Sequence, residues 1–167
     1  MIEPFRHNSW ATIRLLEYCR DVDPAVLDAS APGTFGPVRD TLAHLVGWEE
    51  VLVGAVEGIP PSGQPPHFTS LDDLLERAHR LAERWLRTLE QEPHPERLVE
   101  FGTGGSRRLV RAGTVLAQAV HHGNHHRSQV CTVLSTVDIQ PPALDGWAYG
   151  TWLAETADRR RRREDAL

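Results

Sequence analysis

Apolar residues recur at helical spacing in several stretches of the chain, and glycine and proline separate these stretches. The clearest stretch begins near Leu71 and places apolar residues three or four positions apart as far as Leu89, which gathers them on one face of a helix. Ser70 can cap its start, and Asp72 and Asp73 lie in the first turn, where the helix dipole favours anions. This stretch therefore predicts an amphipathic helix with one buried face.

The same spacing predicts five helices. They run over residues 3–20, 37–57, 70–91, 110–136 and 146–163. Residues 98–110 depart from helical spacing, because two short apolar runs flank a Gly-rich centre there, and they predict a short hairpin or an extended crossover. We therefore expect an all-α protein, a bundle of four long helices with an additional C-terminal helix, in a single domain over residues 1–167.

Composition and charge narrow the classes of partner. The net charge is -5 with both signs interspersed, whereas nucleic-acid binders concentrate basic charge on one face. The five arginines at 159–163 are interpreted as a solvated helix end. Cys19 and Cys131 are too few for a disulfide framework or a cysteine zinc site. No segment resembles a signal peptide or a membrane span, so we expect a cytoplasmic protein without nucleic-acid or membrane partners.

Histidine is the residue type that suggests a function. The run HHGNHHRSQ at 121–129 contains two pairs of histidines four residues apart, and such a pair can point two ring nitrogens at one metal ion. On a helical wheel with His122 at zero, the apolar residues occupy about 20° to 120°, His126 lies at about 40°, and His121 and His125 fall at negative angles. His122 and His126 are therefore predicted to face inward. A shared cation would satisfy both imidazoles, and pairing through ordinary hydrogen bonds is the alternative.

A third metal ligand should come from another helix. His44 is the best candidate, because it lies at the edge of an apolar face that includes Leu45 and Trp48. His79 is a weaker alternative, since its charged neighbours indicate a solvent-exposed position. The three remaining histidines lie near the terminus or in predicted loops and are expected at the surface: His7, His67 and His94.

With His44 on one helix and H-x-x-x-H-R-x-Q on another, the chain resembles the DinB family of bacterial metal-binding four-helix-bundle proteins, also described as DinB/YfiT-like metalloenzymes. The resemblance extends over nearly the whole chain. It includes residues 43–45, residues 122–129, the stretch 134–145 with its Pro141-Pro142 pair, and Trp147 to Gly150 at the start of the last predicted helix.

The resemblance implies an up-down-down-up bundle in which His44, His122 and His126 bind a divalent metal ion, zinc or nickel. Position 118 is a histidine in some relatives and is Gln118 here, which leaves a fourth protein ligand open. Gln129 matches a glutamine of the family. It is interpreted either as a hydrogen-bond partner of a metal ligand or as a polar residue at the rim of the site.

Three histidine ligands leave at least one coordination position open, and that position decides the chemistry. A bound ion can lower the pKa of water towards about 7 for hydrolysis, or it can hold a thiol as the more nucleophilic thiolate. The resemblance implies the second, with a low-molecular-weight thiol such as bacillithiol, mycothiol or glutathione. Glu49 and Glu50 are candidate general bases, but they are interpreted as solvent-facing, so no catalytic residue is assigned.

The resulting hypothesis is a metal-dependent thiol S-transferase or related detoxification enzyme, acting on a low-molecular-weight thiol and an electrophilic small molecule. A metal-dependent hydrolase and a non-enzymatic metal- or ligand-binding stress protein are the alternatives. We also expect a homodimer, mostly by resemblance, with an exposed apolar strip supplied by Trp10, Trp147 and Trp152.

Overall fold

The protein is an all-α bundle with one small hairpin, as predicted. The computed structural model describes residues 2–60, 67–102 and 107–165. The order of elements is α1 (Ile2–Arg20), a short 3-10 helix η1 (Pro24–Asp28), α2 (Val38–Glu57), α3 (Leu71–Glu90), β1 (Leu98–Phe101), β2 (Arg108–Arg111), α4 (Ala112–Thr136) and α5 (Gly146–Glu164). The periodicity of the sequence did not predict η1. Its first turn is capped by the Asp23 carboxylate, which accepts a hydrogen bond from the Ala25 amide at 2.9 Å.

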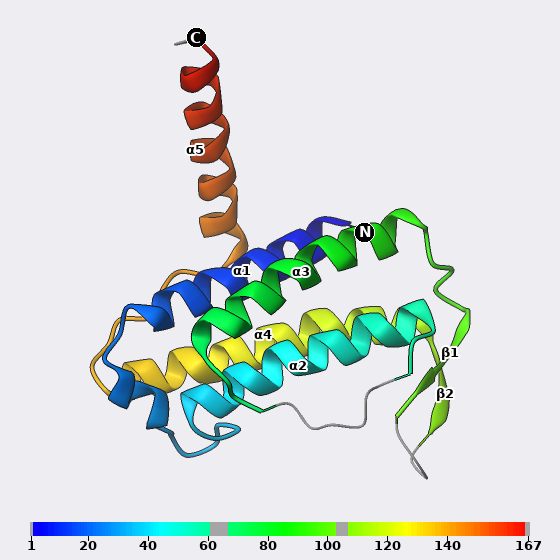
Figure 1. The fold of residues 1–167 in the computed structure, drawn as a ribbon, viewed down its shortest axis with the longest axis horizontal. Coiled ribbons are helices and arrows are strands. Elements are labelled where there is room, and N and C mark those ends of the chain that lie inside the picture. Colours follow the sequence, from blue (N-terminus) through cyan, green and yellow to red (C-terminus); the bar gives the residue numbers. More distant parts are fainter. Residues whose placement is uncertain (1, 61–66, 103–106, 166–167) are drawn as a thin grey trace.

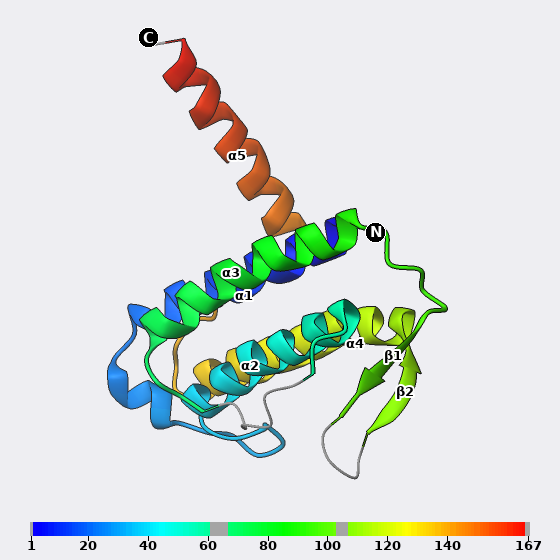
Figure 2. The same cartoon turned by 45° about the vertical axis from the view of Figure 1, so that its right-hand side comes forward.

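The four long helices lie in two layers. Helix α1 packs beside α3, and α2 packs beside α4 (Figures 1 and 2). In Figure 1, α1 and α4 run in one direction and α2 and α3 in the other, so the topology is up-down-down-up as expected. The inward faces share one apolar core, whose largest fully buried side chains include Leu15, Leu42, Val46, Leu74, Trp85 and Leu134.

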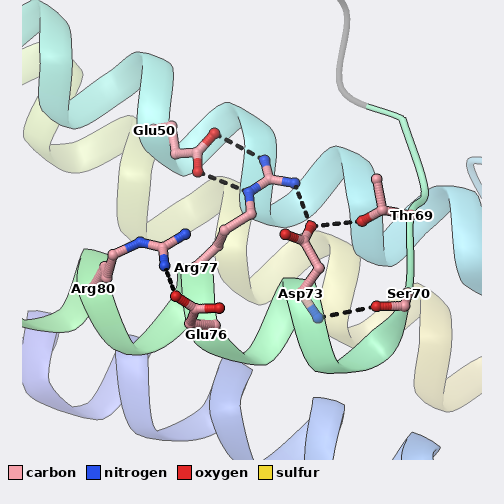
Figure 3. A network of polar contacts seen from close by, with 7 residues as sticks. All are labelled: Glu50, Thr69, Ser70, Asp73, Glu76, Arg77 and Arg80. Atoms are coloured by element: carbon pink, nitrogen blue, oxygen red, sulfur yellow. Dashed lines mark hydrogen bonds and ion pairs between the residues drawn. The ribbon is translucent and has the colours of Figure 1, made fainter.

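Local signals explain where α2 and α3 end and begin. Helix α2 ends at Gly58, whose φ of 80° is a left-handed conformation that glycine adopts at little cost. Helix α3 begins at Ser70, whose hydroxyl accepts a hydrogen bond from the Asp73 amide at 3.1 Å. Arg77 then ties the two helices together, since it makes two hydrogen bonds to the Glu50 carboxylate, at 2.8 and 2.9 Å, and reaches Asp73 at 3.4 Å (Figure 3).

The hairpin precedes α4 directly and changes where that helix starts. Strands β1 and β2 are antiparallel, with Val99 opposite Val110 and Phe101 opposite Arg108. The predicted centre of the turn, residues 103–106, lies outside the described residues. Our prediction that helix 110–136 begins at Val110 was wrong by two residues, because Val110 and Arg111 pair with β1 and the helix starts at Ala112.

Helix α5 stands away from the bundle in both views (Figures 1 and 2). Tyr149 is its one buried residue among those described, and it packs against Trp10 with ring centroids 5.3 Å apart. Trp147 is 89% exposed and Trp152 is 40% exposed. The homodimer expected through these tryptophans stays a prediction. The arginines at 159–163 are all exposed, in agreement with a solvated helix end, and no helix within the described ranges is long and apolar enough to span a membrane.

Candidate metal centre

The structure brings the three predicted histidines together across the α2–α4 layer. His44 lies on α2, and His122 and His126 lie one turn apart on α4. One ring nitrogen from each falls within 4.8 Å of the others. The Nε2 atoms of His44 and His122 are 3.2 Å apart. His126 is buried, the other two are half-buried, and His121 and His125 are exposed, so the helical wheel identified the inward pair correctly.

The donor set fits a divalent metal ion such as zinc. Zinc–nitrogen bonds of about 2.0–2.1 Å at tetrahedral angles put two ligand nitrogens about 3.3 Å apart, close to the 3.2 Å between His44 and His122. Among the described residues, the buried Nδ1 atom of His122 has no hydrogen-bond partner. This imidazole is therefore not an ordinary core histidine whose ring nitrogens are both paired with protein groups.

Gln129 is placed to orient one of the three imidazoles. His126 Nδ1 donates a hydrogen bond to the Gln129 side-chain oxygen at 2.8 Å, and the Gln129 amide in turn donates to His125 Nε2 at 3.2 Å. With its proton on Nδ1, His126 keeps the Nε2 lone pair free for a metal ion. Of the two interpretations of Gln129 from the sequence, this contact favours the hydrogen-bond partner of a ligand.

The environment keeps the histidines neutral. Burial, followed by the charge of His126, lowers the pKa of His44 to about 4. Burial and the neighbouring histidines lower the pKa of His122 to about 3. Burial also lowers the pKa of His126, and the hydrogen bond that His126 donates to Gln129 opposes this in part. At neutral pH all three imidazoles therefore carry a free lone pair, which is the form that binds a metal ion.

A pocket of about 450 Å³ adjoins the cluster, with His44 and His122 in its wall. Its apolar lining comes from α2, α4 and the hairpin: Trp48, Leu52, Phe101, Val110 and Val115. Its polar lining is Arg108, Thr114 and Gln118. Gln118, at the position where some relatives have a histidine, therefore faces this pocket. No carboxylate or cysteine of the described segments is part of the lining.

Phe35 covers the histidines on a further side. Its ring lies 4.1 Å from the His44 ring and 5.5 Å from the His126 ring, measured between centroids. Phe35 precedes α2, in a glycine- and proline-rich stretch without apolar periodicity, so sequence reasoning missed it. It also missed Arg108 and Phe101, because the hairpin reaches the site through tertiary packing.

Our interpretation of Glu49 as solvent-facing was wrong. Glu49 is 3% exposed and accepts hydrogen bonds from the Asn8 side-chain amide and, at 3.2 Å, from the Trp85 indole. Burial raises its pKa, and the nearby charge of Arg127 partly opposes that rise. Since its partners lie on α1 and α3, Glu49 faces the interior of the bundle and is not placed to act on a molecule in the pocket.

Arg127 completes this buried network on the α1 side of α4. Its Nη1 atom donates to the Asn8 side-chain oxygen at 2.8 Å and to the Thr12 hydroxyl at 3.0 Å. Asn8 fits between α1 and α4 because Gly123 has no side chain: a Cβ atom there would lie 2.2 Å from the Asn8 oxygen. The sequence did not predict this network.

The other histidines follow the prediction with one exception. His67, His79 and His94 are exposed, and none belongs to the cluster. The surface position expected for His7 was wrong, because His7 is half-buried and its Nε2 atom donates to the Leu144 carbonyl at 2.8 Å. The segment between α4 and α5 packs back over α1 and makes this contact.

Comparison with known proteins agrees with this architecture. The chain is similar to the crystal structure of a DinB-like protein from Bacillus cereus ATCC 10987, with a TM-score of 0.60 and 16% identity over 82% of this chain and 90% of that one. At this identity the likeness shows the fold alone. None of the curated proteins matches significantly. The family model of the DinB superfamily matches residues 8–130, a range that contains His44, His122 and His126. The chain belongs to the DinB superfamily.

Proposed function

We propose that this protein is a metal-dependent thiol S-transferase or a related detoxification enzyme. His44, His122 and His126 hold its metal ion, zinc or nickel. The enzyme joins a low-molecular-weight thiol to an electrophilic small molecule. The observation that carries the proposal is the convergence of three neutral imidazoles beside a pocket large enough for a small organic substrate.

An open coordination position supports a catalytic site in preference to a structural one. The cluster contains three histidines and no further histidine, cysteine or carboxylate from the described parts of the chain, whereas structural zinc sites usually have four protein ligands. A bound divalent ion would supply the Lewis acidity that keeps a thiol deprotonated at neutral pH. His126, oriented by Gln129, and His44, packed against Phe35, would hold this ion.

The thiol must come from outside the chain. Cys19 is 1% exposed, and burial raises its pKa to about 12. Burial raises the pKa of Cys131 as well, and neither cysteine lines the pocket. In the proposed reaction the sulfur of the added thiol bonds to the electrophilic carbon, the leaving group departs with its bonding pair, and the thiol proton passes to water.

The pocket lining favours thiol transfer over hydrolysis. A hydrolase of this kind uses a carboxylate or another base to take a proton from attacking water. Among the described residues the pocket contains no carboxylate, and the buried Glu49 is hydrogen-bonded to Asn8 and Trp85. A largely apolar pocket without a carboxylate among its described lining residues instead suits an organic electrophile.

Metal analysis and turnover together test the proposal. We expect about one equivalent of zinc or nickel in the purified chain, retained in the control H79A/H121A, whose two histidines are exposed, and lost in H122A/H126A. The metal-loaded protein is then mixed with bacillithiol, mycothiol or glutathione and a chlorobimane electrophile, and conjugate fluorescence is followed.

Each outcome of that assay separates one function from the others. Metal-dependent conjugation with one of the thiols supports the transferase. Turnover of ester or amide substrates without any thiol, with a pH profile set by bound water, identifies a hydrolase. Stoichiometric metal without turnover of either kind identifies a non-enzymatic metal-binding protein, and both of these results contradict the proposal.

A further inference from the structure

Aromatic rings form a row that leads from the histidine cluster to the hairpin. The Trp48 ring lies 6.0 Å from the His44 ring and 6.3 Å from the His122 ring, measured between centroids. On its other side Trp48 lies 6.1 Å from Phe101, with the two planes inclined by only 35°. All four side chains line the same pocket. A flat apolar molecule that reaches the histidines would therefore contact Trp48 and Phe101 along its length.

Arg108 lies at the hairpin end of this row. It is directly opposite Phe101 in the β1–β2 ladder, its guanidinium lies 5.8 Å from the centroid of the Phe101 ring, and it is part of the pocket lining. The stack over Phe101 holds the guanidinium against the pocket wall, as expected for a cation above an aromatic face.

The charge of Arg108 is not neutralised within the described residues. The neighbouring Arg107 pairs with Glu100 at 3.0 Å, and Arg111 pairs with Glu96 at 3.1 Å. Arg108 makes no ion pair with any residue that the structure describes, and no described carboxylate lines the pocket. A planar guanidinium that forms no ion pair with the described residues matches the two oxygens of a carboxylate or the oxygens of a sulfonate.

We propose that the pocket selects small molecules that combine a flat apolar body with one anionic group, a carboxylate or sulfonate. Trp48 and Phe101 contact the body, and Arg108 binds the anion. The inference rests on the proposed function in that this molecule is the substrate which approaches the histidine cluster. A neutral apolar molecule would contact only Trp48 and Phe101. A small hydrophilic anion would contact only the exposed Arg108, and such a surface ion pair contributes little binding energy by itself.

A matched pair of fluorescent probes tests this selectivity. The probe 8-anilino-1-naphthalenesulfonate carries a sulfonate, whereas N-phenyl-1-naphthylamine has nearly the same rings without it. Both are titrated against the full chain as purified and again after chelation, in the absence of thiol. We expect R108Q to weaken binding of the sulfonate about two- to fivefold, the contribution of an exposed charge pair, and to leave the neutral probe unchanged.

Three further variants make the result specific. R107Q removes the neighbouring, already paired arginine and should leave both probes unchanged. W48A should weaken both probes alike, because Trp48 contacts the shared rings. R108K keeps the positive charge but replaces the planar guanidinium, which can donate two parallel hydrogen bonds, with an ammonium group. Its affinity for the sulfonate should therefore fall between those of the wild type and R108Q. Near-UV circular dichroism confirms that each variant is folded.

The proposal is overturned if R108Q binds the sulfonate as tightly as the wild type, if R108Q weakens both probes equally, or if the folded wild type binds neither. These titrations need neither metal nor turnover. A failed transferase assay therefore leaves the selectivity of the pocket intact, and a failed probe titration leaves metal binding and thiol transfer untouched.

Discussion

Replacing Gly123 with alanine sets two physical effects against each other. Gly123 lies in α4 between His122 and His126. Helix propensity alone predicts that alanine stabilises the helix interior by about 1 kcal/mol. The structure predicts the opposite, because the added Cβ atom would lie 2.2 Å from the Asn8 side-chain oxygen and 2.7 Å from Arg127 Nη1.

The steric effect should dominate, because the atoms that must move are buried and hydrogen-bonded. Asn8 is 0% exposed and Arg127 is 4% exposed. Arg127 donates to Asn8 and Thr12, and Asn8 donates to the buried Glu49. Overpacking costs about 1–3 kcal/mol and a buried polar group without its partner about 1–3 kcal/mol. Against a gain of about 1 kcal/mol from propensity, we expect a net destabilisation of about 1–5 kcal/mol.

Urea unfolding of the chelated protein, followed by far-UV circular dichroism, measures this difference. The matched control is G150A on α5, where an added Cβ atom meets nothing within 4 Å, so its free energy of unfolding should rise by up to about 1 kcal/mol, the gain from helix propensity alone. The double variant N8A/G123A removes the clashing side chain, so its loss should be smaller than the sum of the two single losses. The reasoning is refuted if G123A is as stable as the wild type.

Three further predictions follow from the same geometry. The free energy of unfolding of the metal-free protein should fall as the pH drops from 6.5 towards 4. In this range His44 and His122 bind protons in the unfolded chain but not in the folded one, where their pKa values are about 4 and about 3. Urea midpoints of an H122N variant should fall less steeply with pH, and an unchanged slope would contradict this. Q129L should weaken zinc binding about 10–100-fold in chelator competition, since His126 loses its orienting partner; unchanged affinity would make Gln129 a rim residue. Light scattering should give a dimer for the wild type and a monomer for W147S/W152S, and a monomeric wild type would exclude the homodimer.

The fold and the histidine cluster could be predicted because the signals behind them are local. Helical spacing of apolar residues is a property of each segment, and it gave the long helices within a residue or two of their observed ends. The same periodicity fixed which side of α4 is buried, and so distinguished His122 and His126 from their exposed neighbours. His44 was selected from the apolar face beside it, and the family resemblance then implied that it binds the same ion as His122 and His126.

What the sequence did not reveal depends on contacts between distant segments. Glu49 stands next to Glu50 and has the same residue type, yet one is buried and the other pairs with Arg77 at the surface of the α2–α3 contact. The packing of α1 and α3, which bring Asn8 and Trp85 to Glu49, decides between these environments. Arg108 and Phe101 enter the pocket for a similar reason, since the hairpin's placement against α2 and α4 is not encoded in any short pattern.

Helix α4 carries the Arg127–Asn8 network on one side and the His122/His126 pair on another, and the position of each restricts that of the other. Arg127 faces α1, where it is hydrogen-bonded to Asn8, and it follows His126 directly in a helix that turns about 100° per residue. Because Gly123 lets Asn8 approach, the network on the α1 side reinforces the rotation of α4 that its buried apolar residues also favour. Any rotation that moved His122 and His126 away from His44 would also break the hydrogen bonds of a buried guanidinium, which is costly. The network thus favours the rotation of α4 in which His122 and His126 face His44 on α2, so that folding already organises these three side chains before any ion binds.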